Sequence, residues 1–187
     1  MGENLNAIEA LLQDHQEVRQ LFTEIASKTG EDKQTAFQRL VFELARHETA
    51  EEEVIYPLVR RDVDGGDDLA DARIKEEDEA KKVLADLEKL DVSSTEFDTK
   101  FEQFRTAVLA HAESEETQVF PQLREVKDDD SLNAVGRVLD LAKKTAPTHP
   151  HPNVPGTATA NLLAGPMAAV IDRTRDAIRD ARQKLAS

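Results

Sequence analysis

The chain has 187 residues, of which 33% are charged, 39% are hydrophobic and only 4% are aromatic, a composition that favours long amphipathic helices over sheets. Its 38 acidic and 24 basic residues give a formal net charge of −14, which argues against nucleic acid or an anionic membrane surface as a partner. Because cysteine is absent, disulfides, thiolate metal sites and iron–sulfur clusters are excluded.

The sequence carries no signal for export or for membrane insertion. The first residues lack a basic segment followed by an apolar one, and no apolar run approaches the ~20 residues of a membrane span. We therefore expect a cytoplasmic protein.

The first two predicted helices cover residues 3–28 and 32–62, and each carries an apolar stripe with a spacing of three or four residues. In the first helix the stripe has one gap, which His15 fills. In the second helix the stripe turns polar for two steps, at His47 and Glu51. The apolar members are Ile8, Leu11, Val18, Phe22 and Ile25 in the first helix and Phe37, Leu40, Leu44, Val54 and Leu58 in the second.

The next two predicted helices show the same interruption of an apolar face. In the third, residues 68–91, the stripe continues to Glu77, with Glu76 beside it. The fourth helix begins near residue 97, and its stripe meets His111 and Glu115 where apolar residues are due. The apolar members are Ala80, Leu84 and Leu87 in the third helix and Phe97, Phe101, Phe104 and Val108 in the fourth.

Four long helices joined by short loops predict an all-α fold, an antiparallel up-down-up-down four-helix bundle. A short extra helix is predicted at 131–144, which completes a bundle region of residues 1–145. A proline-rich connector, 146–161, then leads to an amphipathic helix at 166–185, and we expect this extension, 146–187, to pack on the bundle. The alternative for the last helix is binding to a partner or a membrane.

A repeated motif links the second and fourth helices. HETAEEEVIYP at 47–57 matches HAESEETQVFP at 111–121 with a constant offset of 64 residues. His15 lies 32 residues before the first copy, and Glu77 lies 34 residues before the second. Each copy therefore has a polar core position on the preceding helix, as two related hairpins would.

The spacing within each copy suits metal binding. Residues four apart lie ~6 Å apart along a helix, so His47 with Glu51, and His111 with Glu115, can each hold one cation. Packed antiparallel, the hairpins would bring both pairs to one level of the interior together with His15 and Glu77. An isolated His–Glu pair on a charged helix is usually exposed, but two copies in register on apolar faces favour the metal site.

Three buried carboxylates would cost many kcal/mol without a compensating cation. The core stripes show no lysine or arginine at this level. Six histidine and glutamate ligands suit two octahedral ions bridged by carboxylates, and Glu51 and Glu115 are the expected bridges.

At these residues the chain resembles the hemerythrin-like family, also called the HHE cation-binding domain. The resemblance covers about residues 5–125 and rests on Asp14-His15, on His47 and Glu51 before Tyr56-Pro57, and on His111 and Glu115 before Phe120-Pro121. It implies a four-helix bundle around a non-haem di-iron site that binds dioxygen, senses oxygen or iron, or handles peroxide or nitric oxide.

The third helix departs from the family pattern. Where the family usually has a histidine, this chain has Glu77 in the pair Glu76-Glu77, so either glutamate is a candidate ligand. A carboxylate-rich set favours ferric iron and also suits manganese, and it argues against simple reversible oxygen carriage.

Several further residues near the motifs have two interpretations. The hydroxyl of Tyr56 either enters the site, as a hydrogen-bond donor or an extra ligand, or faces water. Pro57 and Pro121 should bend their helices beyond the ligands. The connector histidines either lie on a surface loop or cover one end of the bundle; they are His149 and His151. The glutamates off the buried stripe are expected to be solvated; they are Glu52, Glu53, Glu113 and Glu116.

The expected function is that of a monomeric di-iron protein acting on dioxygen, hydrogen peroxide or nitric oxide. A peroxide-dismutating enzyme competes with an oxygen or iron sensor or a metal-binding protein without catalysis. A helical interaction module is the alternative of a different class.

Overall fold

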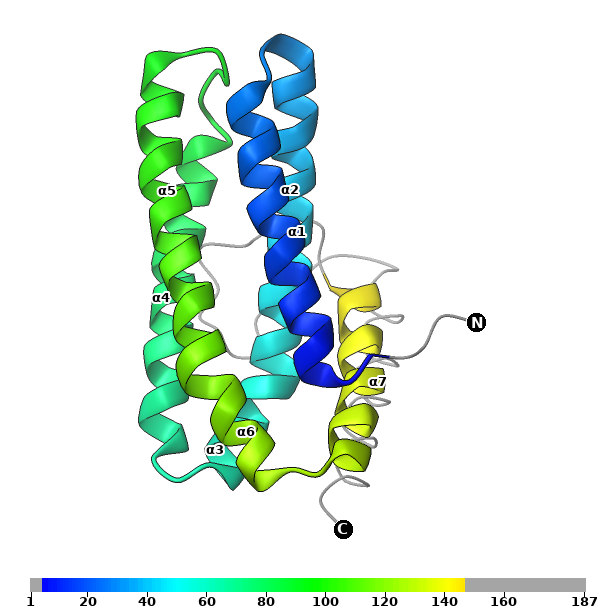
Figure 1. Cartoon of the computed structure of the whole chain (residues 1–187). Coiled ribbons are helices and arrows are strands. Elements are labelled where there is room, and N and C mark those ends of the chain that lie inside the picture. The colour runs from blue at the N-terminus through cyan, green and yellow to red at the C-terminus, as the bar shows by residue number, and fades with distance from the viewer. Residues whose placement is uncertain (1–4, 147–187) are drawn as a thin grey trace, which may run out of the picture.

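The computed structural model describes residues 5–146, and all regular elements in this range are helical, as predicted. Four long helices form the bundle: α1 (Ala7–Ser27), α2 (Gly30–Ala50), α4 (Gly66–Leu87) and α5 (Thr95–Ser114). They run side by side, with α1 next to α2 and α4 next to α5 (Figure 1). The predicted four-helix bundle is confirmed.

The connections are short because local signals end one helix and begin the next. The side chain of Asn6 accepts a hydrogen bond of 3.0 Å from the backbone N–H of Glu9, whose carboxylate accepts one of 3.2 Å in return, and this capping box begins α1. Ser94 caps α5 in a similar way. At Gly66 a Cβ atom would lie 2.1 Å from the carbonyl oxygen of Val59, so only glycine allows this turn.

The helix predicted at 32–62 is interrupted, and so is the fourth helix. A π-helical turn, η1 (Glu51–Ile55), follows α2 and leads into α3 (Tyr56–Asp62). Likewise η2 (Glu115–Val119) follows α5 and leads into α6 (Phe120–Val126). The predicted bends thus begin on the glutamates themselves, and α6 leaves the axis of α5 (Figure 1).

Proline explains the two π-helical turns. Pro57 and Pro121 have no N–H to donate and cannot continue an α-helical hydrogen-bond ladder. The preceding N–H groups, of Tyr56 and Phe120, donate five residues back, to the carbonyls of Glu51 and Glu115. Each π-helical turn therefore runs from the glutamate that begins it to the residue before the proline.

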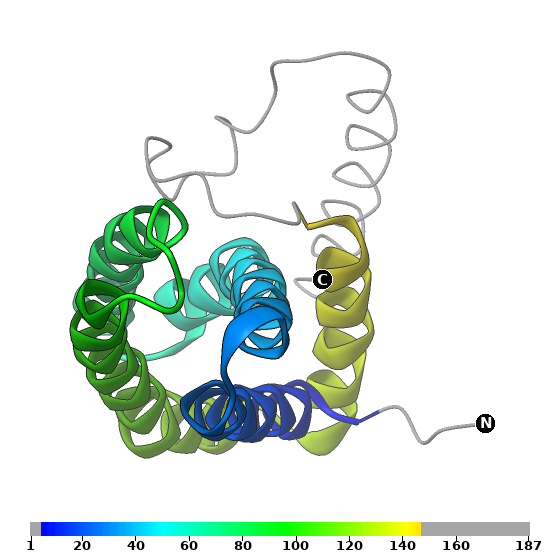
Figure 2. The same ribbon diagram turned by 90° about the horizontal axis from the view of Figure 1, so that it is seen from above.

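A fifth long helix, α7 (Asp129–Thr145), confirms the helix predicted at 131–144 and packs outside the bundle against α1 and α2 (Figure 2).

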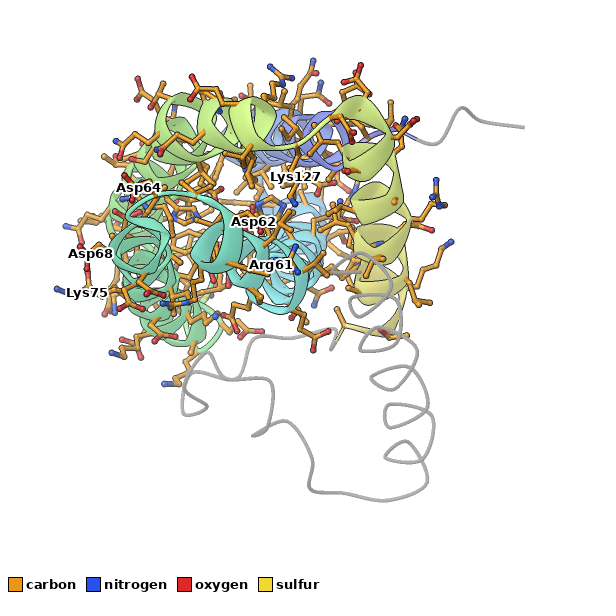
Figure 3. All side chains as sticks on the ribbon, turned by 90° about the horizontal axis from the view of Figure 1, so that it is seen from below. Arg61, Asp62, Asp64, Asp68, Lys75 and Lys127 are labelled. Atoms are coloured by element: carbon orange, nitrogen blue, oxygen red, sulfur yellow. The ribbon has the colours of Figure 1, made fainter. Side chains whose placement is uncertain are left out.

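At the end of the bundle, an ion pair joins α3 to the residue after α6: the Asp62 carboxylate lies 2.9 Å from Lys127, and it also lies 2.7 Å from its neighbour Arg61 (Figure 3). The connector 146–161 and the helix 166–185 lie, apart from Ala146, outside the described residues, as do His149 and His151.

The apolar core is divided into two clusters, one on either side of a polar level. One cluster is built around aromatic rings of α1, α2 and α5, namely Phe22, Phe37, Phe97, Phe101 and Phe104. The other joins η1, α3, η2 and α6 to α7 through Ile55, Tyr56, Phe120, Leu123 and Leu139, among others. Within the described range no helix is long and apolar enough to span a membrane.

Candidate metal centre

The polar level between the two apolar clusters contains all six residues predicted as ligands. The bundle helices α1 and α2 present His15 and His47, α4 presents Glu77, and α5 presents His111, while Glu51 and Glu115 open the two π-helical turns. Glu51 and Glu115 are 0% exposed, and the other four are buried or nearly so.

Their side chains fall into two donor groups that share one carboxylate. His15, His47, Glu51 and Glu115 place one donor atom each within 4.8 Å of one another, and so do Glu51, Glu77 and His111. Glu51 belongs to both groups. Glu115 also faces both, because its Oε2 lies 3.3 Å from His15 Nε2 and 3.5 Å from His111 Nε2. The two donor groups are therefore joined at these carboxylates and form one cluster that could hold a metal cation.

Several buried donor atoms at this level have no hydrogen-bond partner. Both oxygens of Glu51, Oε2 of Glu77, Oε2 of Glu115 and Nε2 of His111 are in this condition. Each such buried group costs ~1–3 kcal/mol, and more if it is charged. A bound cation would supply the partner that these buried oxygens and the imidazole nitrogen lack, because the atoms of each group lie close together.

Electrostatics separates the three carboxylates. Burial, together with the charges of its neighbours Glu115 and Glu77, raises the pKa of Glu51 well above its ordinary value. Burial and the nearby Glu48 also raise the pKa of Glu77. Burial opposes ionisation of Glu115 as well, but the imidazoles of His15, His111 and His47 around it hold its pKa at about 2.

Tyr56 enters the site. Its side chain is buried, and its hydroxyl donates to Glu115 Oε1 at 2.9 Å and also contacts Glu77. Burial and the surrounding carboxylates raise the pKa of Tyr56 well above its ordinary value, so the hydroxyl keeps its proton. Of the two alternatives for this residue, the structure supports the inward one, as a hydrogen-bond donor.

Each of the three histidines points Nε2 inward and pairs its Nδ1 with a carboxylate further out. Nδ1 of His15 lies 2.8 Å from Glu116 Oε1, Nδ1 of His47 lies 3.1 Å from Asp14 Oδ2, and Nδ1 of His111 lies 2.9 Å from Glu76 Oε2. Since a carboxylate accepts, Nδ1 donates in each pair, which turns Nε2 of each ring toward the other donors of the site. The structure thus places Glu77 inside and Glu76 outside.

A basic residue holds each of these outer carboxylates in turn. Arg19 lies 2.8 Å from Glu116, Arg73 lies 2.6 Å from Glu76, and Lys143 of α7 pairs with Asp14. Although burial opposes it, the hydrogen bond from His47 and the charge of Lys143 lower the pKa of Asp14. The same sequence of contacts, from a cationic side chain to a carboxylate to an imidazole, therefore recurs at all three histidines.

Two expectations about the surroundings were wrong. Glu116 is not simply solvated, because it accepts from His15 and Arg19. A cation also lies near the site: the Lys81 ammonium is 3.7 Å from Glu77 Oε2 and 3.8 Å from Glu48 Oε2, and it contacts Glu52, which is half-buried. Lys81 stands one turn after Glu77, and its long side chain reaches inward from the edge of the stripe.

Lys81 does not replace a metal ion, since the Glu51 oxygens remain without a hydrogen-bond partner and Glu51 Oε2 lies near His47 Nε2, at 3.1 Å, rather than near Lys81. Glu48, which sequence reasoning missed, is buried beside Lys81, and burial raises its pKa to about 7. Its position next to His47 was the available signal. Of the other glutamates expected in water, Glu113 is exposed and Glu53 is half-buried.

The lysine of α7 offers a direct test of these contacts. Replacing Lys143 by Met should weaken metal binding about 10-fold, because Asp14 loses the cation that keeps it ionised and aligned on His47. The control is Lys144→Met, which removes the neighbouring charge from an exposed pair with Asp140. Competition titration with a chelator measures both, and equal affinities for the two variants would contradict the role of Lys143.

The fold and the site define a helical-bundle protein with a buried histidine and carboxylate cluster for cations. A family model, the Hemerythrin HHE cation binding domain, matches residues 6–123. The chain belongs to this family.

Known proteins of the same kind include an uncharacterized hemerythrin-like protein of Schizosaccharomyces pombe, 28% identical over 90% of this chain and 84% of that protein. A crystal structure of a hemerythrin HHE cation binding domain-containing protein from Mycobacterium kansasii has the same fold, with a TM-score of 0.64 and 22% identity over 92% of this chain and 89% of that one.

A DNA nickase of a Nostoc species is 32% identical over 65% of this chain, but the match covers only 34% of the nickase. The shared region is thus about a third of that protein.

Proposed function

We propose that this chain is a non-haem di-iron protein that binds, and reacts with, dioxygen, hydrogen peroxide or nitric oxide. The single observation that carries the proposal is the pair of donor groups that share Glu51, with buried oxygens in both groups that have no hydrogen-bond partner. In it, His15 and His47 serve one ion, Glu77 and His111 serve the other, and Glu51 and Glu115 bridge them.

The donor set supports iron over zinc. Three carboxylates and three imidazoles exceed what a zinc ion takes, and hard oxygen donors favour iron or, as the second choice, manganese. When bound, a pair of such ions supplies redox chemistry toward a small oxygen-containing molecule. The chain itself holds the donors in place through Asp14, Glu76 and Glu116 and keeps a proton on Tyr56, beside Glu115.

The space beside the site supports a small ligand. A chamber with a volume of about 30 Å³ is lined by the three histidines, by Glu48, Glu76 and Glu77, and otherwise by apolar side chains such as Val18, Leu44 and Val108. A water molecule needs roughly 10–15 Å³ on this measure, so the chamber suits a molecule of about two heavy atoms.

Metal analysis tests the proposal. Protein from iron-supplemented cells should contain about two iron ions per chain, and His47→Ala should lose at least half of them, because His47 lies in one donor group. The control is Glu113→Ala, which changes an exposed residue of the second motif copy. Less than one metal ion per chain, unchanged by His47→Ala, would overturn the proposal.

The reaction itself needs a second assay. Because Glu77 makes the set richer in carboxylate than a reversible carrier, we expect the iron-loaded protein to release dioxygen from hydrogen peroxide over many turnovers. A stable visible oxygen adduct without turnover would instead support a binding or sensing role.

A further inference from the structure

Two cavities meet at the wall between α4 and α5, the two helices that lie side by side in Figure 1. The inner one is the chamber of about 30 Å³ beside the metal centre, and the outer one is a surface groove with a volume of about 380 Å³. Four residues line both cavities: Glu76, Ala80, Ala107 and His111.

Two of the four residues that line both cavities are alanines, which have the smallest side chain after glycine. Ala80 is 8% exposed on α4, and Ala107 is exposed on α5, so only two methyl groups fill the apolar part of the wall. The polar part is the contact of 2.9 Å between His111 Nδ1 and Glu76, which Arg73 also holds. On either side of the site, by contrast, the core is filled by large rings such as Phe22, Phe104 and Phe120.

We propose that small neutral molecules reach the metal centre through this wall, between Ala80 and Ala107. This proposal rests on the function proposed above. It adds the route by which the small molecule reaches the metal centre and the selectivity of that route for neutral molecules over anions.

The charge of the groove decides which molecules pass. Its charged or titratable lining residues are Glu76, Glu79 and His111, and the remainder is apolar or uncharged: Ala80, Val83, Gln103, Phe104, Ala107, Ala110 and Ser114. The two carboxylates repel anions, and the protein as a whole carries a net charge of −14. Dioxygen, nitric oxide and hydrogen peroxide are neutral and meet no such barrier, whereas azide is an anion.

The first test closes the wall. In Ala107→Phe a large ring covers the wall from an exposed position, so the fold and the iron content should be kept. Association of nitric oxide with the reduced, iron-loaded protein, followed by stopped-flow absorbance, should slow about tenfold or more. Ala72→Phe, an exposed change on α4 outside both cavities, should bind at the wild-type rate. A wild-type rate for Ala107→Phe at equal iron content would overturn the route.

The second test changes the charge of the groove without narrowing it. Glu79→Lys should raise the association rate of azide with the oxidised, iron-loaded protein about threefold or more at low salt, and less at high salt. The rate for nitric oxide should not change, because the molecule is neutral. Unchanged azide association at low salt would overturn the selectivity.

A third test uses metal-free protein, so its result on the proposed opening does not depend on the proposed di-iron function. In metal-free protein, hydrogen–deuterium exchange at C2 of the His111 ring, read by mass spectrometry, should be slower in Ala107→Phe than in wild type or Ala72→Phe. Slowed exchange in a protein that binds no iron would support the opening and refute the di-iron function. Equal exchange in all three proteins would refute the opening.

Discussion

Replacing Glu51 by Gln should abolish binding of the metal pair and at the same time stabilise the metal-free protein by ~1–3 kcal/mol. Glu51 is 0% exposed, both of its oxygens lack a hydrogen-bond partner, and it belongs to both donor groups. The amide has nearly the same shape, stays neutral beside Glu77 and Glu115 without taking up a proton, and offers N–H donors to their oxygens. Metal analysis and thermal unfolding in chelator measure the two effects.

The expected rise in melting temperature is ~2–4 °C for each kcal/mol in a chain of this size. Glu113→Gln is the matched control, since it makes the same change at an exposed position and should alter neither property. A Glu51→Gln protein that still binds two ions would show that Glu51 is not a bridge. A less stable metal-free variant would show that Glu51 has a structural partner.

Glu51→Gln is expected to lower metal affinity and to raise the stability of the metal-free protein, because metal binding and stability place opposite demands on a buried carboxylate. A site that must accept cations keeps its donors unpaired until the metal arrives, and the fold tolerates the cost through its two apolar clusters. Residues such as Phe37 and Phe97, whose rings lie 5.1 Å apart edge to face, stabilise the bundle away from the site.

The inward-facing donors could be predicted because helix periodicity fixes them. His15, His47, Glu77, His111 and Glu115 each interrupt an apolar stripe, and an interruption on a buried face is visible in the sequence. The motif copies give the same information twice.

The outer shell could not be predicted, because it depends on long side chains and on tertiary packing. Glu116 lies one residue from a ligand candidate and off the stripe, yet it reaches His15 on another helix. Lys143 meets Asp14 across 129 residues, through the packing of α7, which periodicity alone does not place. The missing N–H of Pro57 predicts a bend beyond Glu51, but the sequence does not show that the hydrogen bonding already changes at Glu51, where the π-helical turn begins.

A second large effect is the pH dependence of the free energy of unfolding. We expect stability to fall with rising pH in the metal-free protein and to rise with pH in the metal-loaded protein. The raised pKa values of Glu51 and Glu77 mean that the folded, metal-free protein holds protons that the unfolded chain releases near the ordinary value of 4.5. Their contribution is therefore complete below about pH 4.5 and is lost as the pH rises toward their folded values. Each group adds a slope of at most ~1.4 kcal/mol per pH unit.

The two histidines with shifted pKa values determine the pH range in which the stability of the metal-free protein should be measured. His47 has a lowered pKa, chiefly because it is buried, so it adds stability as the pH rises to its ordinary value of 6.5 and has no effect above it. His111 has a raised pKa, since its hydrogen bond to Glu76 and nearby carboxylates outweigh burial, and its contribution is lost with rising pH. Glu115, with a pKa of about 2, is ionised throughout. Above about pH 7 the surviving contributions all fall.

Metal-free protein should therefore lose stability as the pH rises above about 7. Metal-loaded protein should gain stability over the same rise, because bound ions require deprotonated ligands and compete better with protons. Denaturant unfolding at several pH values, with chelator or with iron, measures both slopes. Glu51→Gln should flatten the metal-free slope, and Glu113→Gln should leave it unchanged. A metal-free slope of zero would mean that Glu51 and Glu77 are already ionised in the folded state, and that the charge they bring is balanced without a metal ion.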